Sequence, residues 1–219
     1  MSNFVLVKPK QGQLKTTVQR DYILLDRSPS MEERWGEALG AVNTYIRKLA
    51  TAGVNTKITV AVFDYGYEVI RRDVEPASCR PITSADTKLG GGTALNDAIG
   101  KLVAQAKSDN PERAALAIMT DGDENCSEKV TTGQAQALLN QCRLRGWQVI
   151  FLGIDHDNTR LAREYGASPR QFISTGKEDI ASVMAKVADK RVAYGQTQAS
   201  IEFSASEKKD AGKFLIGSA

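Results

Sequence analysis

Histidine and cysteine are scarce in this sequence, and their scarcity excludes several classes of protein. The 219 residues include one histidine and three cysteines. One histidine cannot build a multi-histidine metal site, and three cysteines cannot build a four-cysteine zinc site. An odd number of cysteines is also a poor disulfide framework. Any metal that this chain binds must therefore be held by oxygen atoms.

Long apolar segments are absent as well. No window approaches the roughly 18 apolar residues of a membrane-spanning helix, and the run Phe4–Val7 is too short for the core of a signal peptide. The net charge is only +3, without the concentrated basic face typical of nucleic-acid-binding proteins. We therefore expect a cytoplasmic protein with reduced thiols and with no nucleic-acid or membrane partner.

Strand-like and helix-like apolar patterns alternate along the chain. Strands are expected at 22–25, 58–63, 67–74, 114–119, 148–154 and 171–174. Helices are expected at 35–49, 94–107, 134–144, 158–165 and 179–192. Such alternation predicts an α/β fold with a mostly parallel central sheet and helices on both faces. The turn at Asp64–Gly66 predicts one antiparallel edge strand.

The length is typical of one domain. We expect residues 1–20 to be an N-terminal extension and residues 21–194 to be the folded domain. Residues 195–219 are rich in Gln, Ser, Ala and Lys and are expected to form a flexible C-terminal tail. Within it, Phe214–Ile216 is an apolar segment suited to docking.

Small oxygen-bearing side chains are concentrated in three loops next to the expected strands and helices. Asp26, Ser28 and Ser30 follow the first strand with alternating spacing, Thr93 follows three glycines, and Asp121 follows another apolar strand. In open α/β sheets, ligands bind beyond the carboxyl ends of strands where the winding reverses. If the strands before Asp26 and Asp121 are neighbours at that point, the carboxylates of both residues face one crevice. Two carboxylates and three hydroxyls suit a hard cation such as Mg²⁺.

Simpler interpretations of the same residues stay open. Ser30 with Glu33 fits a capping box, so that Ser30 would cap the next helix. Thr93 would likewise suit a helix cap, and Asp121-Gly122 is a common turn pair. Each of these roles is compatible with metal binding.

The five residues carry a resemblance to the von Willebrand factor type A domain family, over about residues 21–192. The metal-ion-dependent adhesion site of that family has an Asp-x-Ser-x-Ser loop, a distant Thr and a distant Asp. The matching positions are Asp26, Ser28, Ser30, Thr93 and Asp121. The resemblance implies a Rossmann-like, three-layer fold. It also implies a bound Mg²⁺ or Mn²⁺ ion whose coordination is completed by a partner's carboxylate. Pro29 departs from the family's usual small, flexible residue.

The resemblance implies a metal-dependent protein-interaction module and no enzyme. Its partner would be a protein that supplies an Asp or Glu carboxylate, and Asp123, Glu124 and His156 would form a rim that selects the partner. The small size and cytosolic character look like stand-alone bacterial or phage members, including those associated with tellurite resistance.

Two other functions remain as alternatives. The same cation would suit a metal-dependent phosphohydrolase, and the C-terminal tail would suit a scaffold that docks through it. A serine hydrolase is disfavoured, because His156 is the only histidine and no Gly-x-Ser-x-Gly elbow exists.

Overall fold

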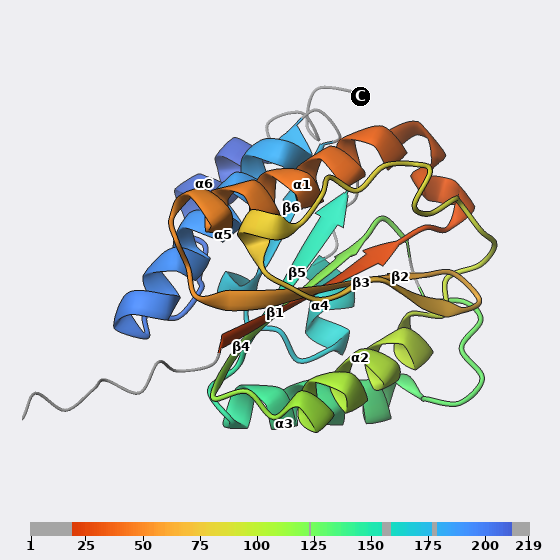
Figure 1. Cartoon of the computed structure of the whole chain (residues 1–219). Helices are drawn as coiled ribbons and strands as arrows, with labels where there is room; N and C mark the ends of the chain where they lie inside the picture. Colours follow the sequence, from red (N-terminus) through yellow and green to blue (C-terminus); the bar gives the residue numbers. More distant parts are fainter. Residues whose placement is uncertain (1–18, 123, 155–158, 177–178, 212–219) are drawn as a thin grey trace, which may run out of the picture.

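A mixed β-sheet with helices on both faces makes up the part of the chain that the computed structural model describes, which is residues 19–211 without 123, 155–158 and 177–178 (Figure 1). The strands are β1 (Gln19–Asp26), β2 (Thr56–Phe63), β3 (Tyr67–Val74), β4 (Arg113–Thr120), β5 (Gln148–Ile154) and β6 (Phe172–Thr175). The helices are α1 (Trp35–Thr51), α2 (Leu95–Asp109), α3 (Thr132–Leu144), α4 (Thr159–Glu164), α5 (Ile180–Thr197) and α6 (Ala205–Ala211). Three short 3₁₀ helices are η1 (Pro29–Arg34), η2 (Pro76–Ser78) and η3 (Pro169–Gln171).

The sheet has the strand order β3-β2-β1-β4-β5-β6, and only the β2–β3 pair is antiparallel. From β1 the chain moves outward to β2 and β3, then returns to the other side of β1 with β4. The winding therefore reverses between β1 and β4, where Leu25 pairs with Met119. The predicted fold class is confirmed, including the antiparallel edge strand.

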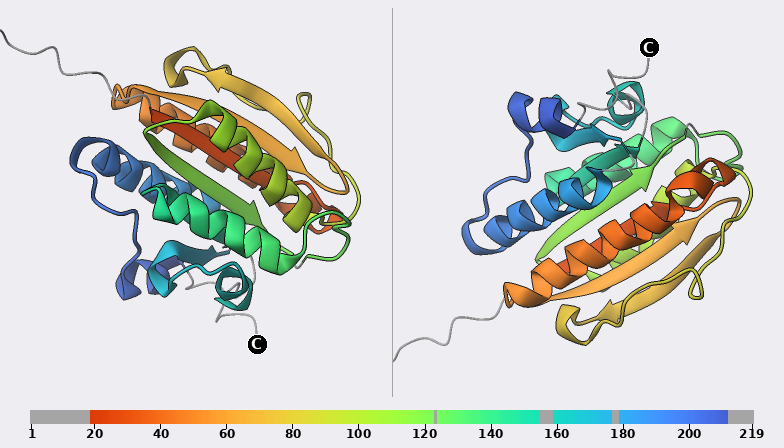
Figure 2. Two further views of the ribbon diagram at one scale, coloured as in Figure 1. Left: turned by 90° about the horizontal axis from the view of Figure 1, so that it is seen from below. Right: turned by 90° about the horizontal axis from the view of Figure 1, so that it is seen from above.

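Side chains of successive residues on each strand point to opposite faces of the sheet. On β1, Ile23 and Leu25 pack in the cluster that includes α1 and α5, whereas Tyr22 and Leu24 pack in the cluster of α2 and α3. Figure 2 shows these two helical layers on either side of the sheet. Because both faces are covered, each central strand contains an apolar run, which is why these runs predicted the strands correctly.

The start of β1 holds an ion pair that the sequence patterns did not indicate. Asp21 is 1% exposed and Arg191 of α5 is 0% exposed. Arg191 Nε donates to Asp21 Oδ1 at 2.6 Å, and Arg191 Nη2 donates to Asp21 Oδ2 at 3.0 Å. The hydroxyls of Tyr45 and Thr56 donate to the same carboxylate, each at 2.6 Å. The carboxylate therefore connects α1, β2 and α5 at one buried point.

The region predicted as a C-terminal tail is packed on the domain as far as the structure describes it. Helix α5 continues to Thr197, and the chain then forms α6. Ile201 and Phe203 are 0% and 2% exposed and belong to the same core cluster as α1 and α5. Two apolar side chains separated by polar residues are too sparse a signal to predict this packing. The expectation of a flexible tail is therefore wrong for residues 195–211.

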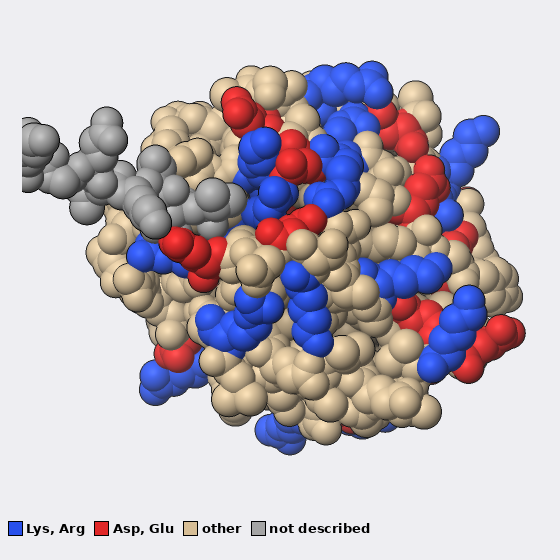
Figure 3. Space-filling model, turned by 60° about the horizontal axis from the view of Figure 1, so that its bottom comes forward, with Lys and Arg blue, Asp and Glu red and all other residues tan. Residues whose placement is uncertain are grey.

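The domain boundaries as such stay a prediction, but β1 begins inside the predicted extension, at Gln19. The segment Phe214–Ile216 lies outside the described residues. None of the described helices is long and apolar enough to cross a membrane. On the face seen in Figure 3, acidic and basic side chains are interleaved and do not gather by sign.

Candidate metal centre

The predicted metal ligands meet where β1 and β4 end, at the right-hand side of Figure 1. Asp26 is the last residue of β1, and Asp121 follows the last residue of β4. Ser28 Oγ and Ser30 Oγ are 3.0 Å apart, and Ser30 Oγ donates to Asp121 Oδ1 at 2.7 Å. Hydrogen bonds therefore link the loop after β1 to the carboxylate that follows β4.

Thr93 faces the same space from the loop before α2. A Cβ atom added to Gly122 would lie 3.8 Å from Ser30 Oγ and 3.9 Å from Thr93 Oγ1, so the two hydroxyls border one small volume. The backbone of Thr93 is held by Asn125, whose Oδ1 accepts the Thr93 N–H at 2.9 Å. Three separate loops thus bring their hydroxyls and carboxylates together.

Asp26 is a fully buried carboxylate, with 0% of its surface exposed. Its oxygens accept the Ser28 N–H at 2.8 Å and the Thr120 hydroxyl at 2.6 Å, but no described Lys or Arg forms an ion pair with it. Burial raises the pKa of Asp26 to about 6, with a smaller contribution from the negative charge of Asp121, against the lowering effect of these hydrogen bonds. A buried charge without a cation is costly. This donor set therefore fits a hard divalent cation, which would supply the missing positive charge.

Asp121 has a different environment. It is 3% exposed, and Arg34 Nη1 donates to its Oδ2 at 3.2 Å. The same Arg34 nitrogen donates to the Ser30 carbonyl at 2.6 Å. The guanidinium therefore balances part of the Asp121 charge, so the two carboxylates of the centre are not equivalent. Arg34 lies in η1, which the sequence patterns missed, and its position near the site could not be inferred from spacing.

The three glycines before Thr93 are required by close packing against the hairpin turn of β2 and β3. A Cβ atom on Gly90 would lie 1.6 Å from Asp64 Oδ2, and one on Gly92 would lie 2.4 Å from a ring carbon of Tyr65. Gly92 also has a φ of +65°, which favours glycine. The glycines therefore place Thr93 at the centre by allowing the backbone to pass directly beside these side chains.

The simpler cap interpretations do not hold. Helix α1 begins at Trp35, and Ser30 lies inside η1, with its hydroxyl directed to Ser28 and Asp121 instead of a helix end. The N-cap of α2 is Ala94, so Thr93 is not its cap. Both hydroxyls are therefore available to the candidate centre.

One predicted rim residue has a role inside the fold. Glu124 Oε1 accepts the backbone N–H groups of Cys126 and Ser127, at 2.9 and 2.7 Å. Its Oε2 accepts the Asn96 N–H at 2.7 Å, near the start of α2, and the Ser127 hydroxyl at 2.6 Å. Glu124 thus ties the loop after β4 to α2. The other two predicted rim residues, Asp123 and His156, lie outside the described residues.

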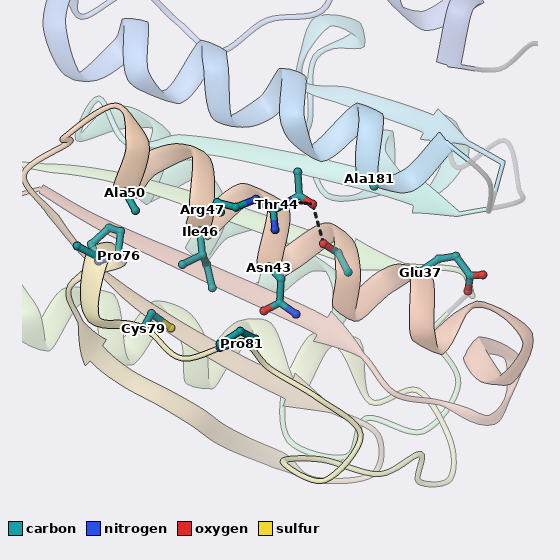
Figure 4. Close-up of a pocket in the computed structure, with 12 residues that line it drawn as sticks. Glu37, Asn43, Thr44, Ile46, Arg47, Ala50, Pro76, Cys79, Pro81 and Ala181 are labelled. Carbon is teal, nitrogen blue, oxygen red and sulfur yellow. Dashed lines mark hydrogen bonds between the residues drawn. The ribbon is translucent and has the colours of Figure 1, made fainter.

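A separate hollow of about 650 Å³ lies between α1 and the segment that follows β3 (Figure 4). Glu37, Asn43, Pro76 and Cys79 are among its lining residues, and Ala181 comes from α5. Asn43 Nδ2 donates to the Ile82 carbonyl, and the Ile82 N–H donates to Asn43 Oδ1, each at 2.8 Å. None of the predicted metal ligands lines this hollow, so it is not part of the candidate centre.

Comparison with known proteins finds one matching family and no curated relative. The profile of the von Willebrand factor type A domain matches residues 22–185. No curated protein matches the chain significantly.

Solved structures with a similar fold include adhesive proteins. The vWF domain of the type V pili tip protein Mfa5 from Porphyromonas gingivalis is 11% identical, with a TM-score of 0.64 over 83% of this chain and 97% of that domain. The pilus adhesin SpaC from Lactobacillus rhamnosus GG is 14% identical, with a TM-score of 0.66 over 82% of this chain, which spans 30% of SpaC. Manganese-loaded TRAP protein from Plasmodium vivax is 17% identical, with a TM-score of 0.56 over 77% of this chain and 72% of that chain. At these identities the likeness shows the fold.

Proposed function

We propose that this chain, which belongs to the von Willebrand factor type A domain family, is a protein-interaction module that binds Mg²⁺ or Mn²⁺ and recognises a carboxylate of a partner protein. The observation that carries the proposal is the buried Asp26 carboxylate, which has no ion pair with any described Lys or Arg and lies beside a cluster of hydroxyls. The manganese-loaded structure of a protein with this fold supports a divalent cation, and the pilus adhesins support a role in binding.

The roles of the ligands follow from their chemistry. Asp26 and Asp121 would contribute charge, directly or through water, and Ser28, Ser30 and Thr93 would contribute neutral hydroxyl oxygens. Two carboxylates balance a divalent ion and the hydroxyls add no charge. The cation would therefore remain attractive to an anionic oxygen from outside, which a partner Asp or Glu would supply.

Calorimetric titration of the chelator-treated protein with Mg²⁺ or Mn²⁺ tests the proposal. We expect saturable binding by the wild type and binding at least about 100-fold weaker by an Asp26→Ala, Asp121→Ala double variant, because both ligand charges are removed. Circular dichroism of the variant checks that it is folded. If the double variant binds either ion as tightly as the wild type, the metal site is not at these residues.

Metal affinity should fall in mildly acidic solution. Because the pKa of Asp26 is raised to about 6, protons compete with the cation for this carboxylate below that pH. We expect the affinity to decrease about tenfold per pH unit well below pH 6 and to be nearly constant above pH 7. Titrations at a series of pH values measure this slope. An affinity that does not change between pH 7 and pH 5 would contradict the assigned role of Asp26.

The site is proposed to hold a ligand and not to transform it. The described groups around it are hydroxyls, carboxylates and the Arg34 guanidinium, and none of them is a histidine. A screen of generic phosphate esters with Mg²⁺ tests the phosphohydrolase alternative. Metal-dependent turnover that disappears in Asp26→Ala would contradict our proposal and would show that the protein is an enzyme.

Docking through the C-terminal tail is a weaker alternative, because Ile201 and Phe203 are already buried in the core of this chain. A cytoplasmic location remains part of the proposal, and the free thiols of Cys79, Cys126 and Cys142 support a reducing compartment.

A further inference from the structure

An exposed aromatic side chain lies next to the candidate metal centre. Tyr65, at the turn between β2 and β3, is 72% exposed, and among the described residues only Leu144 is a comparably exposed large hydrophobic residue. The Tyr65 N–H donates to the Gly91 carbonyl at 2.8 Å. Its ring lies so close to Gly91 and Gly92 that a Cβ atom on either would meet a ring carbon at 2.6 or 2.4 Å. The ring is thus held in place one residue from Thr93, and fixed, exposed tyrosines are enriched among residues that dominate binding energy.

A small hollow of about 160 Å³ has Tyr65 among its lining residues. It is bordered by the hairpin turn, the first turns of α2 and the loop after β4. Its charged lining residues are Asp97, Lys101, Glu128 and Lys129. The volume is several times that of a water molecule, whose share of the liquid is about 30 Å³, so it accommodates an acidic side chain.

The two ammonium groups of the hollow lack acceptors. Lys101 and Lys129 are exposed, and the ammonium group of neither forms an ion pair or hydrogen bond with any described residue. Lys101 Nζ lies 5.7 Å from the centre of the Tyr67 ring. Both side chains are therefore free to bind an incoming anion.

The carboxylate of Asp97, in contrast, already accepts hydrogen bonds from the backbone. Its Oδ1 accepts the backbone N–H groups of Lys129 and Val130, at 3.0 and 2.7 Å, and its Oδ2 accepts that of Glu128 at 3.2 Å. Burial opposes its ionisation, but these three donors, together with the positive charge of Lys129, outweigh burial and lower its pKa. Apart from Asp97, Glu128 is the one acidic residue in the lining, and it is exposed.

We propose that this hollow binds a second acidic side chain of the partner, so that the partner is an acidic segment with one carboxylate at the metal and a second in the hollow. This inference rests on the proposed function, in which the first carboxylate binds the metal. An extended segment places residues i and i+2 on one face about 7 Å apart, so one short segment can present two carboxylates to two sites that both lie beside Tyr65. The Tyr65 ring then packs against the backbone between the two acidic residues.

Binding of a hexa-aspartate peptide and of acetate, both at saturating Mg²⁺, tests the second site by calorimetry or by NMR titration. A Lys101→Gln, Lys129→Gln double variant should bind the peptide about 5- to 10-fold more weakly, since two exposed charge pairs are lost. Its affinity for Mg²⁺ and for acetate should equal that of the wild type, because neither lysine touches the metal centre. Glu128→Gln should bind the peptide more tightly, because a like charge is removed.

The control is a Lys57→Gln, Lys107→Gln double variant, which loses the same charge outside the lining of the hollow, where Lys57 pairs with Asp73 and Lys107 bonds to Gln141. We expect it to bind the peptide as the wild type does. Equal weakening by both double variants, or no weakening by either, overturns the second site while leaving Mg²⁺ and acetate binding intact. Failure of the wild type to bind Mg²⁺ would instead overturn the proposed function, and the second site with it.

Discussion

An Asp26→Asn variant is expected to lose metal binding and yet to be more stable than the wild type without metal. Asparagine keeps the size of the side chain and removes its charge, so the affinity for Mg²⁺ should fall by at least about 100-fold. The carboxylate is fully buried and its pKa is raised from 3.8 to about 6. At roughly 1.4 kcal/mol per pKa unit, its ionisation at neutral pH costs the fold on the order of 3 kcal/mol. Removing that charge should raise the free energy of unfolding by about 1–3 kcal/mol.

The pH dependence of this gain is the sharper test. A raised pKa means that the folded state holds the proton more tightly, so the wild type loses stability as the pH rises from about 4 through 6. The advantage of Asp26→Asn should therefore be present at pH 7 and absent near pH 4, as measured by urea unfolding in chelator. A variant that is less stable than the wild type at pH 7 would show that the charge of Asp26 does not destabilise the metal-free fold.

Asp97→Asn serves as the matched control. Its carboxylate accepts three backbone N–H groups, and the net effect is a lowered pKa. Asparagine has one acceptor oxygen instead of two, so this variant should be destabilised by about 1–2 kcal/mol. Its affinity for Mg²⁺ should be unchanged, because Asp97 is not among the proposed ligands. The same chemical change is therefore expected to have opposite effects on stability at the two positions.

The second large effect is expected at the buried ion pair between Asp21 and Arg191. Arg191→Met keeps the bulk of the side chain and leaves the Asp21 carboxylate buried without its cation. Removing one partner of a buried pair typically costs about 3–5 kcal/mol. The loss should be near the upper end of that range, because Arg191 also donates to Gln19 Oε1 at 2.8 Å. Urea unfolding followed by circular dichroism measures it.

Two further variants separate the buried charge from other effects. An Asp21→Asn, Arg191→Met double variant should recover part of the lost stability, since no uncompensated charge remains. Lys48→Met breaks the exposed pair with Asp189, in which Nζ and Oδ1 are 2.6 Å apart, and should cost less than about 1 kcal/mol. If Arg191→Met is as mild as Lys48→Met, the Asp21 carboxylate does not depend on its ion pair.

The fold was predictable from local pattern because both faces of the sheet are covered. Central strands such as β4 and β5 are apolar along nearly their whole length, and the helices have one apolar face, so each element has its own signal. The capping box at Thr131 is a further local feature, with the Gln134 N–H bonded to Thr131 Oγ1 at 3.3 Å. Errors occurred where a few isolated residues pack at long range, as Ile201 and Phe203 do.

The candidate metal residues could likewise be found from the sequence, because their position depends only on where strands end. Asp26 and Asp121 each follow an apolar run, and residues at the carboxyl ends of neighbouring parallel strands meet at one edge of the sheet. The sequence could not indicate Arg34, which reaches Asp121 only through the 3₁₀ turn of η1, or the internal hydrogen bonds of Glu124.

The sequence by itself therefore determined the order of the strands and helices and the choice of the five oxygen-bearing residues of the candidate centre. Both are properties of short segments, in which periodicity and residue type are sufficient. Only the tertiary structure decided which charges are compensated: Asp26 has no Lys or Arg partner in the described part of the chain, Asp121 is bonded to Arg34, and Asp21 is paired with Arg191. These differences arise from burial and from contacts between residues far apart in the chain, and the energy of a charge depends on those surroundings.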